Sequence, residues 1–361
     1  MRIAINTGGG DAPGLNAVIR AVVLSADERG WEVFGIRKGY NGLLDGEDDE
    51  VVRLDRASVR GITHLGGTIL GTTNRGDPLA WPMKRPDGTV ETVDRGDEIL
   101  EAFRERGFDA LVAVGGDGSL RIAAELARRG LKVVGVPKTI DNDLAATTVT
   151  FGFHTAVQTA SDAIGRLHST AESHRRVMVV EVMGRDAGWI ALFAGLAGTA
   201  DAILIPEIPY RLDPLCEKIE SRYDDDDGFA IVVVAEGARP EGGDPVFEEP
   251  HPETGMPRYG GIAERLAEQI HEITGRETRS LVLGHLQRGG EPIAYDKILA
   301  LRFGAAAVHL LAEGHFGCMV ALDPPDVLAV PLEEATAKMK LVPIEGDVVN
   351  TARSLGVSFG D

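Results

Sequence analysis

The sequence predicts an α/β protein with two domains, each built on a parallel sheet that helices cover on both faces. Three observations carry this prediction: apolar runs alternate with helical stretches, glycine-rich turns follow several runs, and the chain has 361 residues. Uninterrupted apolar runs are typical of strands buried on both faces, as in parallel sheets. A single hydrophobic core rarely grows to this size, so two domains are expected.

The predicted elements alternate from one end of the chain to the other. Strands are expected at the apolar runs 2–6, 32–36, 110–114, 132–136, 177–182, 202–206, 230–235 and 280–284. Helical spacing of apolar residues predicts helices at 15–28, 97–106, 119–129, 153–166, 212–222 and 260–273. The apolar stretch from Trp189 to Ile205 is interrupted by glycine and aspartate, so it predicts a buried helix and a strand. A membrane span would need about 20 apolar residues.

Composition excludes several classes of protein. The net charge is −19 at pH 7, so we expect neither nucleic acid nor an anionic membrane as a partner. The two cysteines, Cys216 and Cys318, cannot form a structural zinc site and are expected to be buried thiols. No apolar leader follows Met1, and we therefore expect a cytoplasmic protein.

Glycine-rich turns at two predicted strand ends indicate phosphate binding. The first turn, TGGGDAPGLN at 7–16, and the second turn, VGGDGSL at 114–120, each place backbone N–H groups at a helix N-terminus. Glycine turns also close strands for steric reasons alone. Asp117 in the second turn sharpens the prediction, because an acid beside a phosphate requires a divalent cation between them.

The third turn, VPKTIDNDL at 136–144, contains two carboxylates, Asp141 and Asp143. They are compatible with an Asx turn and a helix cap. They are equally compatible with a general base that removes a hydroxyl proton, supported by the neighbouring carboxylate. Five basic residues lie near predicted strand ends of the second half: Arg176, Arg185, Arg279, His285 and Arg288. In an acidic protein such a group suits a phosphorylated substrate.

Six segments, in order along nearly the whole chain, resemble the phosphofructokinase family. They are TGGGDAPGLNAVIRAVV, GGDGSL, PKTIDND, GFHTA, VEVMGRDAGWIA and LGHLQRGG. The resemblance implies two Rossmann-like three-layer α/β domains, with mostly parallel sheets and the active site in the cleft between them. The phosphoryl-donor domain would comprise 1–152 plus about 287–337, and the fructose 6-phosphate domain 153–286 plus about 338–361.

The resemblance implies an ATP-dependent 6-phosphofructokinase of glycolysis, which transfers the γ-phosphoryl group to the 1-hydroxyl of fructose 6-phosphate. Asp141 would be the general base beside Thr139, and Arg185 would stabilise the transferred group. Mg²⁺ would be held by Asp117. The phosphoryl donor would be bound by Gly10, Arg75, Gly116, Asp117, Gly118, Ser119 and Lys138. The sugar phosphate would be bound by Thr139, Ile140, Asp141, Arg176, Met183, Gly184, Arg185, Glu236, Arg279, His285, Leu286, Gln287 and Arg288.

Departures from the family pattern bear on the donor and on the assembly. Pyrophosphate-dependent members carry Asp at the position of Gly118, where a carboxylate would repel the α-phosphate of ATP, so Gly118 favours ATP. Lys138 is shared with those members, which keeps pyrophosphate as the alternative donor. A kinase for another sugar phosphate and a non-catalytic paralogue are further alternatives.

The resemblance also implies an oligomer. Arg176 and Arg279 would reach the site of a neighbouring subunit, in a homodimer or homotetramer.

The effector site of the regulated bacterial members is only partly matched. Arg20 and Arg56 match its basic residues, whereas Leu24 and His168 replace arginines. Four aspartates at 224–227 stand where lysines are expected. Because anions oppose the binding of an anion, little or no regulation by phosphoenolpyruvate is expected at this site.

Overall fold

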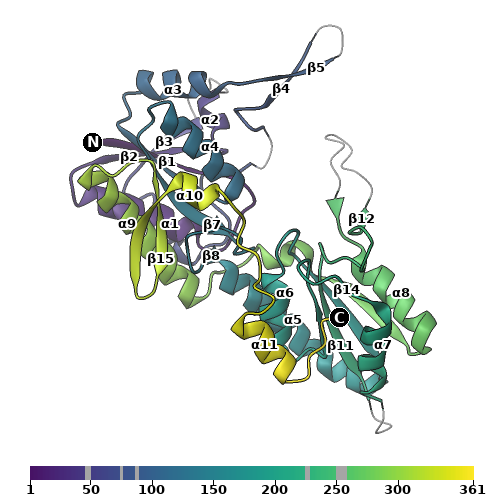
Figure 1. The fold of residues 1–361 in the computed structure, drawn as a ribbon. Helices are drawn as coiled ribbons and strands as arrows, with labels where there is room; N and C mark the ends of the chain where they lie inside the picture. Colours follow the sequence, from purple (N-terminus) through teal and green to yellow (C-terminus); the bar gives the residue numbers. More distant parts are fainter. Residues whose placement is uncertain (45–49, 74–75, 86–88, 224–227, 249–257) are drawn as a thin grey trace. The chain divides into compact units, whose positions relative to one another are not determined.

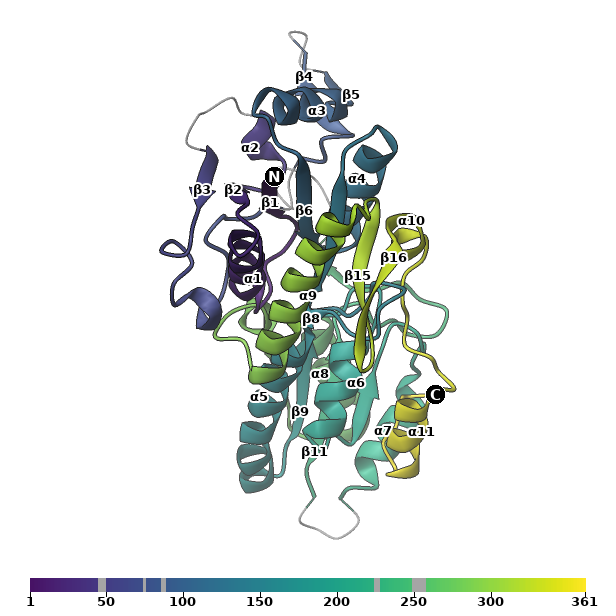
Figure 2. The ribbon, with the colours of Figure 1, turned by 90° about the vertical axis from the view of Figure 1, so that its left-hand side faces the viewer.

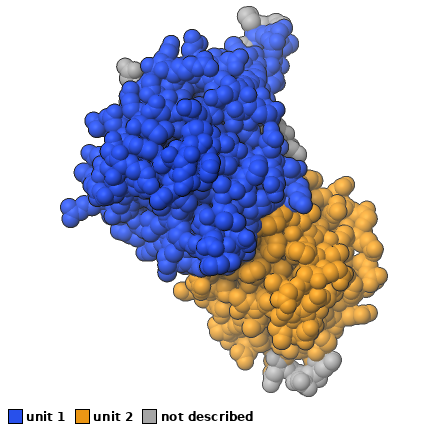
Figure 3. All heavy atoms as spheres, turned by 60° about the vertical axis from the view of Figure 1, so that its left-hand side comes forward, with its two compact units in different colours: residues 1–140, 144–154, 288–339 blue, residues 141–143, 155–287, 340–361 orange. Residues whose placement is uncertain are grey.

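The computed structural model describes residues 1–44, 50–73, 76–85, 89–223, 228–248 and 258–361. The described chain divides into two compact units (Figure 1 and Figure 3). Unit 1 consists of 1–140, 144–154 and 288–339, and unit 2 of 141–143, 155–287 and 340–361. The three residues Asp141–Asp143 thus belong to unit 2, although the segments on either side belong to unit 1 and the division expected from the sequence places them in the first domain.

Unit 1 is built on an eight-stranded sheet with the order β16-β15-β7-β6-β1-β2-β3, in which β8 pairs with β7. Its strands are β1 (Arg2–Thr7), β2 (Glu32–Ile36), β3 (Val51–Leu54), β6 (Ala110–Gly115), β7 (Val133–Thr139), β8 (Phe151–Gly152), β15 (Cys318–Asp323) and β16 (Asp326–Pro331). The central pairs are parallel, and the edge strands β3 and β16 are antiparallel to their neighbours. The parallel sheet predicted from the apolar runs is confirmed.

Helices cover both faces of this sheet. One face packs against α1 (Leu15–Asp27) and α9 (Ala294–Glu313), which lie side by side in Figure 2, and the other against α3 (Gly96–Glu105), α4 (Asp117–Arg128) and α10 (Leu332–Thr336). Alternate residues of β1 divide between the two cores, as the pleat of a strand requires: Ile3 and Ile5 face α1 and α9, whereas Ala4 faces the other core. Gly304 of α9 permits the close approach of α1, because a Cβ there would lie 2.8 Å from the Val18 carbonyl oxygen.

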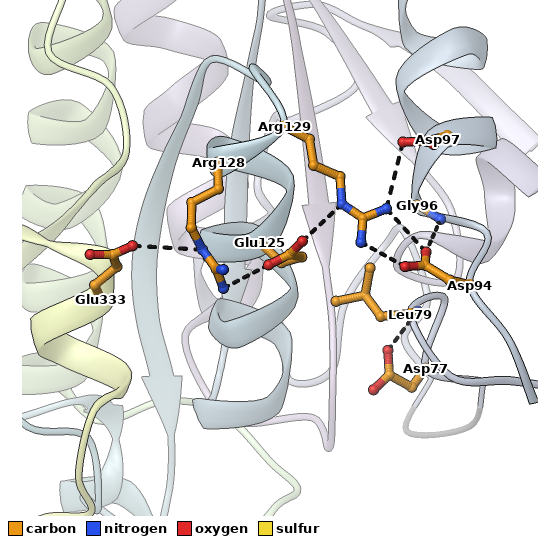
Figure 4. Close-up of polar contacts among 9 residues, drawn as sticks. All are labelled: Asp77, Leu79, Asp94, Gly96, Asp97, Glu125, Arg128, Arg129 and Glu333. Atoms are coloured by element: carbon orange, nitrogen blue, oxygen red, sulfur yellow. Dashed lines mark hydrogen bonds and ion pairs between the residues drawn. The ribbon is translucent and has the colours of Figure 1, made fainter.

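An ion-pair network joins the end of α4 to the start of α3. Arg129 contacts Asp94 at 2.6 Å, Glu125 at 2.9 Å and Asp97 at 3.5 Å (Figure 4). Hydrogen bonds to Asp94 and Glu125 raise the pKa of Arg129 above its usual value. Asp94 also accepts the N–H of Gly96 at 2.8 Å, so it caps the first turn of α3 while it binds α4. The hairpin of β4 (Trp81–Lys84) and β5 (Val90–Val93) directly precedes this network.

Unit 2 is built on a smaller parallel sheet with the order β10-β11-β9-β14. Its strands are β9 (Val177–Val182), β10 (Ala202–Leu204), β11 (Ala230–Ala235) and β14 (Thr278–Val282). Its helices are α5 (Phe153–His174), which begins in unit 1, α6 (Trp189–Ala197), α7 (Leu212–Glu220), α8 (Ile262–Thr274) and α11 (Asp347–Ser354). A short antiparallel pair joins β12 (Phe247–Glu248) to β13 (Arg258–Tyr259). None of the described helices is both long and apolar enough to cross a membrane.

Most predicted elements are present, with three starts shifted by two residues, among them that of α8, which begins at Ile262 and not at residue 260. The helix expected from residue 119 begins at Asp117, because the Gly116 carbonyl already accepts the N–H of Leu120 at 3.0 Å. The strand expected from residue 280 begins at Thr278. Both cysteines are buried free thiols, as predicted. The described elements that the sequence patterns missed include α2 (Asn41–Leu44), α9, α10, α11, β3, β8, β15, β16 and the short strands β4, β5, β12 and β13.

Candidate active site

The first turn is held at the carboxyl end of β1 by the neighbouring strands of unit 1. Gly9 has a φ of 76°, a left-handed conformation that glycine adopts without strain. The N–H of Gly8 donates to the Val114 carbonyl at 2.9 Å. Lys138 of β7 donates from Nζ to the Gly10 carbonyl. The first turn is therefore tied to both β6 and β7, the next two strands of the sheet.

Side chains from distant segments approach this turn closely, so a larger residue at Gly8 or Gly10 would displace them. A Cβ at Gly8 would lie 2.5 Å from Oγ of Ser119, in the second turn. A Cβ at Gly10 would lie 2.9 Å from Nη1 of Arg288, whose guanidinium also donates to the Asp11 carbonyl at 3.3 Å. Unit 1 thus brings together Gly10, Ser119, Lys138 and Arg288, as a phosphate site requires.

The second turn places one carboxylate at the start of α4. Asp117 is in the first helical turn and pairs with Arg121 at 2.7 Å, four residues further along. In the part of the chain that is described, no three His, Cys, Asp or Glu side chains gather as a metal site. Mg²⁺ beside phosphates needs only one or two carboxylates, since phosphate oxygens and water complete its shell. Asp117 next to an N–H-rich turn fits that chemistry.

Gly118 follows Asp117 and faces open space. A Cβ at this position would meet no heavy atom within 4 Å, and the residue does not have the positive φ that favours glycine. Neither packing nor backbone conformation therefore accounts for glycine at this position. Arg75, another residue expected to bind the donor, lies outside the described residues.

In unit 2, the turn after β9 gathers a second set of predicted residues. The N–H of Met183 donates to Oε1 of Gln287 at 3.3 Å, and the N–H of Gly184 donates to Oε1 of Glu236 at 3.5 Å. Gly184 has a φ of 145°, and a Cβ there would lie 2.8 Å from the Ala187 carbonyl oxygen. Glu236 follows β11, so these residues meet where the carboxyl ends of adjacent parallel strands lie.

His285 and Leu286 lie beside this set, on the 3₁₀ turn η3 (Gly284–Gln287) that follows β14, and both are exposed. Gln287 at the end of the same turn is completely buried and donates to the Gly284 carbonyl at 3.1 Å. Its side chain therefore joins the η3 turn to Met183.

Arg185 and Asp141 are electrostatically coupled within unit 2. Desolvation lowers the pKa of Arg185. The hydrogen bond to Asp186 and the nearby negative charges, Asp141 among them, raise this pKa by more, so the net shift is upward. Asp186 contacts the Arg185 guanidinium at 2.5 Å. The two residues just before Asp141 lie in unit 1, where Thr139 ends β7 and Ile140 is buried.

The structure does not bring Arg176 and Arg279 to this set. Both pair with Glu277, at 2.8 Å and 2.5 Å, near the amino ends of β9 and β14. Strand β9 separates Arg176 from Met183, a span of about 20 Å at roughly 3.3 Å per residue. Within one chain these two arginines therefore form a separate basic group.

Glu207 and Lys340, which no sequence pattern singled out, contact segments next to predicted site residues. The partly buried carboxylate of Glu207 accepts the N–H of Gly188 at 3.1 Å and that of Val342 at 2.8 Å, and desolvation raises the pKa of Glu207. Lys340 donates from Nζ to Oδ1 of Asn142 at 2.8 Å. A cavity of about 650 Å³ in unit 2 is lined by Glu207, by Arg185 and by the segment 341–344. No local pattern could identify these contacts, because the partners are far apart in sequence.

Arg20 and Arg56, which match the effector site, and His168, which departs from it, each contact other residues of the chain. Arg20 donates to the Val59 carbonyl at 2.7 Å, and Arg56 pairs with Asp27 and Glu28. A ring nitrogen of His168 lies 2.7 Å from the Gly198 carbonyl oxygen. The aspartates 224–227 lie outside the described residues, so the expected loss of regulation stays a prediction.

Comparison with known proteins identifies relatives along the whole chain. The family model described as phosphofructokinase matches residues 2–311. The ATP-dependent 6-phosphofructokinase of Chloroflexus aurantiacus is 52% identical over 360 residues, which is 100% of this chain and 98% of that protein. The pyrophosphate–fructose 6-phosphate 1-phosphotransferase of Amycolatopsis methanolica is 51% identical over 348 residues, 96% of this chain and 97% of that protein.

A solved structure shares the fold. The Pichia pastoris phosphofructokinase, solved in the T-state, superposes with a TM-score of 0.79 at 31% identity and covers 98% of this chain. This chain spans 36% of the Pichia chain. The similarity agrees with the two mainly parallel α/β units described above.

Proposed function

The chain belongs to the phosphofructokinase family, and we propose that it is an ATP-dependent 6-phosphofructokinase. It transfers the γ-phosphoryl group of ATP to the 1-hydroxyl of fructose 6-phosphate and releases fructose 1,6-bisphosphate and ADP. The relatives that carry this name along their full length support the assignment. A glycolytic reaction of this kind takes place in the cytoplasm, where we place the protein.

On the donor side, the N–H groups of the second turn and the start of α4 bind phosphate oxygens. Gly10, Gly116 and Ser119 leave room for the phosphates, and Lys138 supplies positive charge beside the first turn. Asp117 would hold Mg²⁺, which when bound neutralises charge on the phosphates. Arg75 is assigned to the same donor site from the family resemblance alone.

On the acceptor side, Asp141 accepts the proton of the 1-hydroxyl as that oxygen attacks the γ-phosphorus. The new bond joins this oxygen to phosphorus, the bond to the bridging oxygen of ADP breaks, and the leaving ADP takes the electron pair. Arg185 stabilises the negative charge on the transferred group. The sugar phosphate is bound by Thr139, Ile140, Met183, Gly184, Glu236, His285, Leu286, Gln287 and Arg288.

The observation that carries the choice of ATP is the open space at Gly118. A carboxylate there would stand beside the N-terminus of α4, where the α-phosphate of ATP binds, and like charges repel. The described neighbours leave a Cβ at this position free of contacts, so packing does not require glycine there and a requirement from the donor fits the space. Pyrophosphate has no α-phosphate beyond the transferred pair and would not need this space.

An aldolase-coupled assay with ATP and with pyrophosphate in parallel tests the proposal. We expect turnover with ATP and a kcat for Asp141→Asn that is lower by about 10²–10⁴-fold. Asp162→Asn is the matched control, since Asp162 lies on an exposed part of α5 and contacts Gln158. Turnover with pyrophosphate alone would overturn the choice of donor, and full activity of Asp141→Asn would remove the base.

We further propose that the enzyme is a homo-oligomer in which Arg176 and Arg279 complete a neighbouring subunit's sugar-phosphate site. Their separation from Met183 within one chain supports this. Mixing inactive Asp141→Asn with inactive Arg279→Ala should restore part of the activity, because hybrid oligomers contain some intact sites. Mixtures that stay as inactive as the separate variants would argue for sites built from a single chain.

A further inference from the structure

Lys340, at the start of the C-terminal segment of unit 2, contacts the loop that carries Asp141. Its Nζ donates to Oδ1 of Asn142 at 2.8 Å, and its backbone N–H donates to the Asp143 carbonyl at 2.8 Å. Its own carbonyl accepts the indole N–H of Trp189 at 2.9 Å, and its Nζ lies 5.6 Å from the centre of the Trp189 ring. One residue therefore joins two segments that lie far apart in the sequence.

The residue between the two aspartates has an uncommon backbone conformation. Asn142 is buried and has a φ of 51°, in the left-handed region that asparagine adopts more readily than most non-glycine residues. A conformation of this kind persists where surrounding contacts determine it. Lys340 supplies one contact to the Asn142 side chain and one to the main chain of the next residue. Asp141 directly precedes Asn142, so both contacts act on the residues next to it.

The same C-terminal segment also holds the loop that carries Arg185. Trp189, the partner of Lys340, is the first residue of α6 and follows this loop after three residues. Two residues beyond Lys340, the N–H of Val342 donates to Glu207, whose carboxylate also accepts the N–H of Gly188. The segment is therefore attached to the Arg185 loop at two points and to the Asp141 loop at two more.

The charge of Lys340 is not explained by stability alone. Its side chain is partly buried, and desolvation lowers the pKa of Lys340 to about 8 although the charge of Asp143 opposes the shift. A neutral side chain of similar length would fill the same volume without the cost of burying a charge. What the ammonium adds is a directed hydrogen bond to Asn142, together with the attraction of Asp143 and the contact with the Trp189 ring.

We propose that Lys340 is a positioning residue for phosphoryl transfer, which orients Asp141 through Asn142 and holds it relative to the Arg185 loop through Trp189. Lys340 touches neither substrate in this role. The proposal rests on the proposed function, because it requires Asp141 to be the base.

Steady-state kinetics of Lys340→Met, Lys340→Arg and Lys338→Met test this role. Misplacing a reacting group by about 1 Å costs on the order of 10²-fold, so kcat of Lys340→Met should fall about 10–100-fold. The KM values for ATP and fructose 6-phosphate should stay within about twofold, since no substrate contact is lost. Lys340→Arg should regain part of kcat. Lys338, exposed two residues earlier, is the matched control and should behave as wild type. A kcat of Lys340→Met within about twofold of wild type would overturn the proposal.

A second variant approaches the same contact from the other side. Asn142→Gly keeps the left-handed backbone accessible and removes the acceptor of the Lys340 hydrogen bond. Its kcat should fall by a similar factor with both KM values preserved, which keeps the proposal testable if Lys340→Met does not fold. Wild-type kcat for Asn142→Gly would contradict a role exerted through this side chain.

A double-mutant cycle with Asp141→Asn separates positioning from a general structural effect. If Lys340 acts through Asp141, adding Lys340→Met to Asp141→Asn should lower kcat by less than about twofold further. Losses that multiply in full would show that Lys340 acts independently of the base. Full activity of Asp141→Asn refutes the proposed base and this proposal with it. Inactive Asp141→Asn beside fully active Lys340→Met refutes the role of Lys340 alone.

Discussion

Replacing Lys340 by methionine should remove a pH-dependent cost of folding that the wild-type chain carries. Desolvation lowers the pKa of Lys340 from 10.5 to about 8, and the charge of Asp143 offsets only part of that effect. The difference between the two values corresponds to about 3 kcal/mol, at about 1.4 kcal/mol per pH unit. Methionine avoids this cost but leaves Asn142 without one hydrogen bond, a loss of about 1–3 kcal/mol.

The sign follows from where the proton is bound. Below pH 8 Lys340 is protonated in the folded and the unfolded state, so the full cost of the buried charge is present. Between pH 8 and 10.5 the folded protein releases the proton while the unfolded chain keeps it, and stability therefore rises with pH. Relative to Lys340→Met, the free energy of unfolding of the wild type should rise by about 3 kcal/mol between pH 7 and 10.5. At pH 7 the free energies of unfolding of the two proteins should differ by at most about 2 kcal/mol.

Urea unfolding of wild type, Lys340→Met and Lys338→Met at pH 7 and at pH 10 measures this difference. Lys338→Met controls for the loss of an exposed positive charge two residues earlier in the chain. NMR of ¹³C-methylated lysines gives the pKa directly, and the chain has only eight lysines to resolve. The resonance that is missing from Lys340→Met should titrate near pH 8. A titration of that resonance near 10.5, or a stability offset that is the same at both pH values, would refute the reasoning.

Three further predictions concern the donor, the base and the α3–α4 network. Gly118→Asp should raise KM for ATP at least tenfold, because a negative charge about 4 Å from a phosphate costs up to about 4 kcal/mol at an effective dielectric constant of 20. Steady-state kinetics with ATP and with pyrophosphate test this, and an unchanged KM for ATP would contradict it. Asp141→Asn should lose about 10²–10⁴-fold in kcat while its thermal unfolding midpoint stays close to that of wild type. Arg129→Met should destabilise the protein by about 1 kcal/mol through lost contacts with Asp94 and Glu125. That loss should shrink in 1 M salt in thermal melts, and a salt-independent loss would point to packing instead.

Local signals in the sequence account for the sheets and for the turns between strands and helices. Strands such as β6, β9 and β11 are buried along their whole length, and each appears in the sequence as an uninterrupted apolar run. The first and second turns could be identified because a tight turn from a strand into a helix favours glycine, whatever the surrounding fold. Helix α9 was missed because its apolar residues are not confined to one face: Ile298 is exposed, whereas Leu299 and Ala300 next to it are buried.

What the sequence by itself determined is therefore the set of elements and the chemical groups at their ends, because each depends on neighbours a few residues away. What only the tertiary structure decided is which of these groups meet. Arg288 reaches the first turn across 277 positions, and Lys340 reaches Asn142 across 198. Contacts of this kind are made by packing between distant segments, and they leave no periodicity or spacing in the chain. That is why Asp141 could be named as a candidate base from its turn alone, whereas the lysine that orients its loop emerged only from the folded unit.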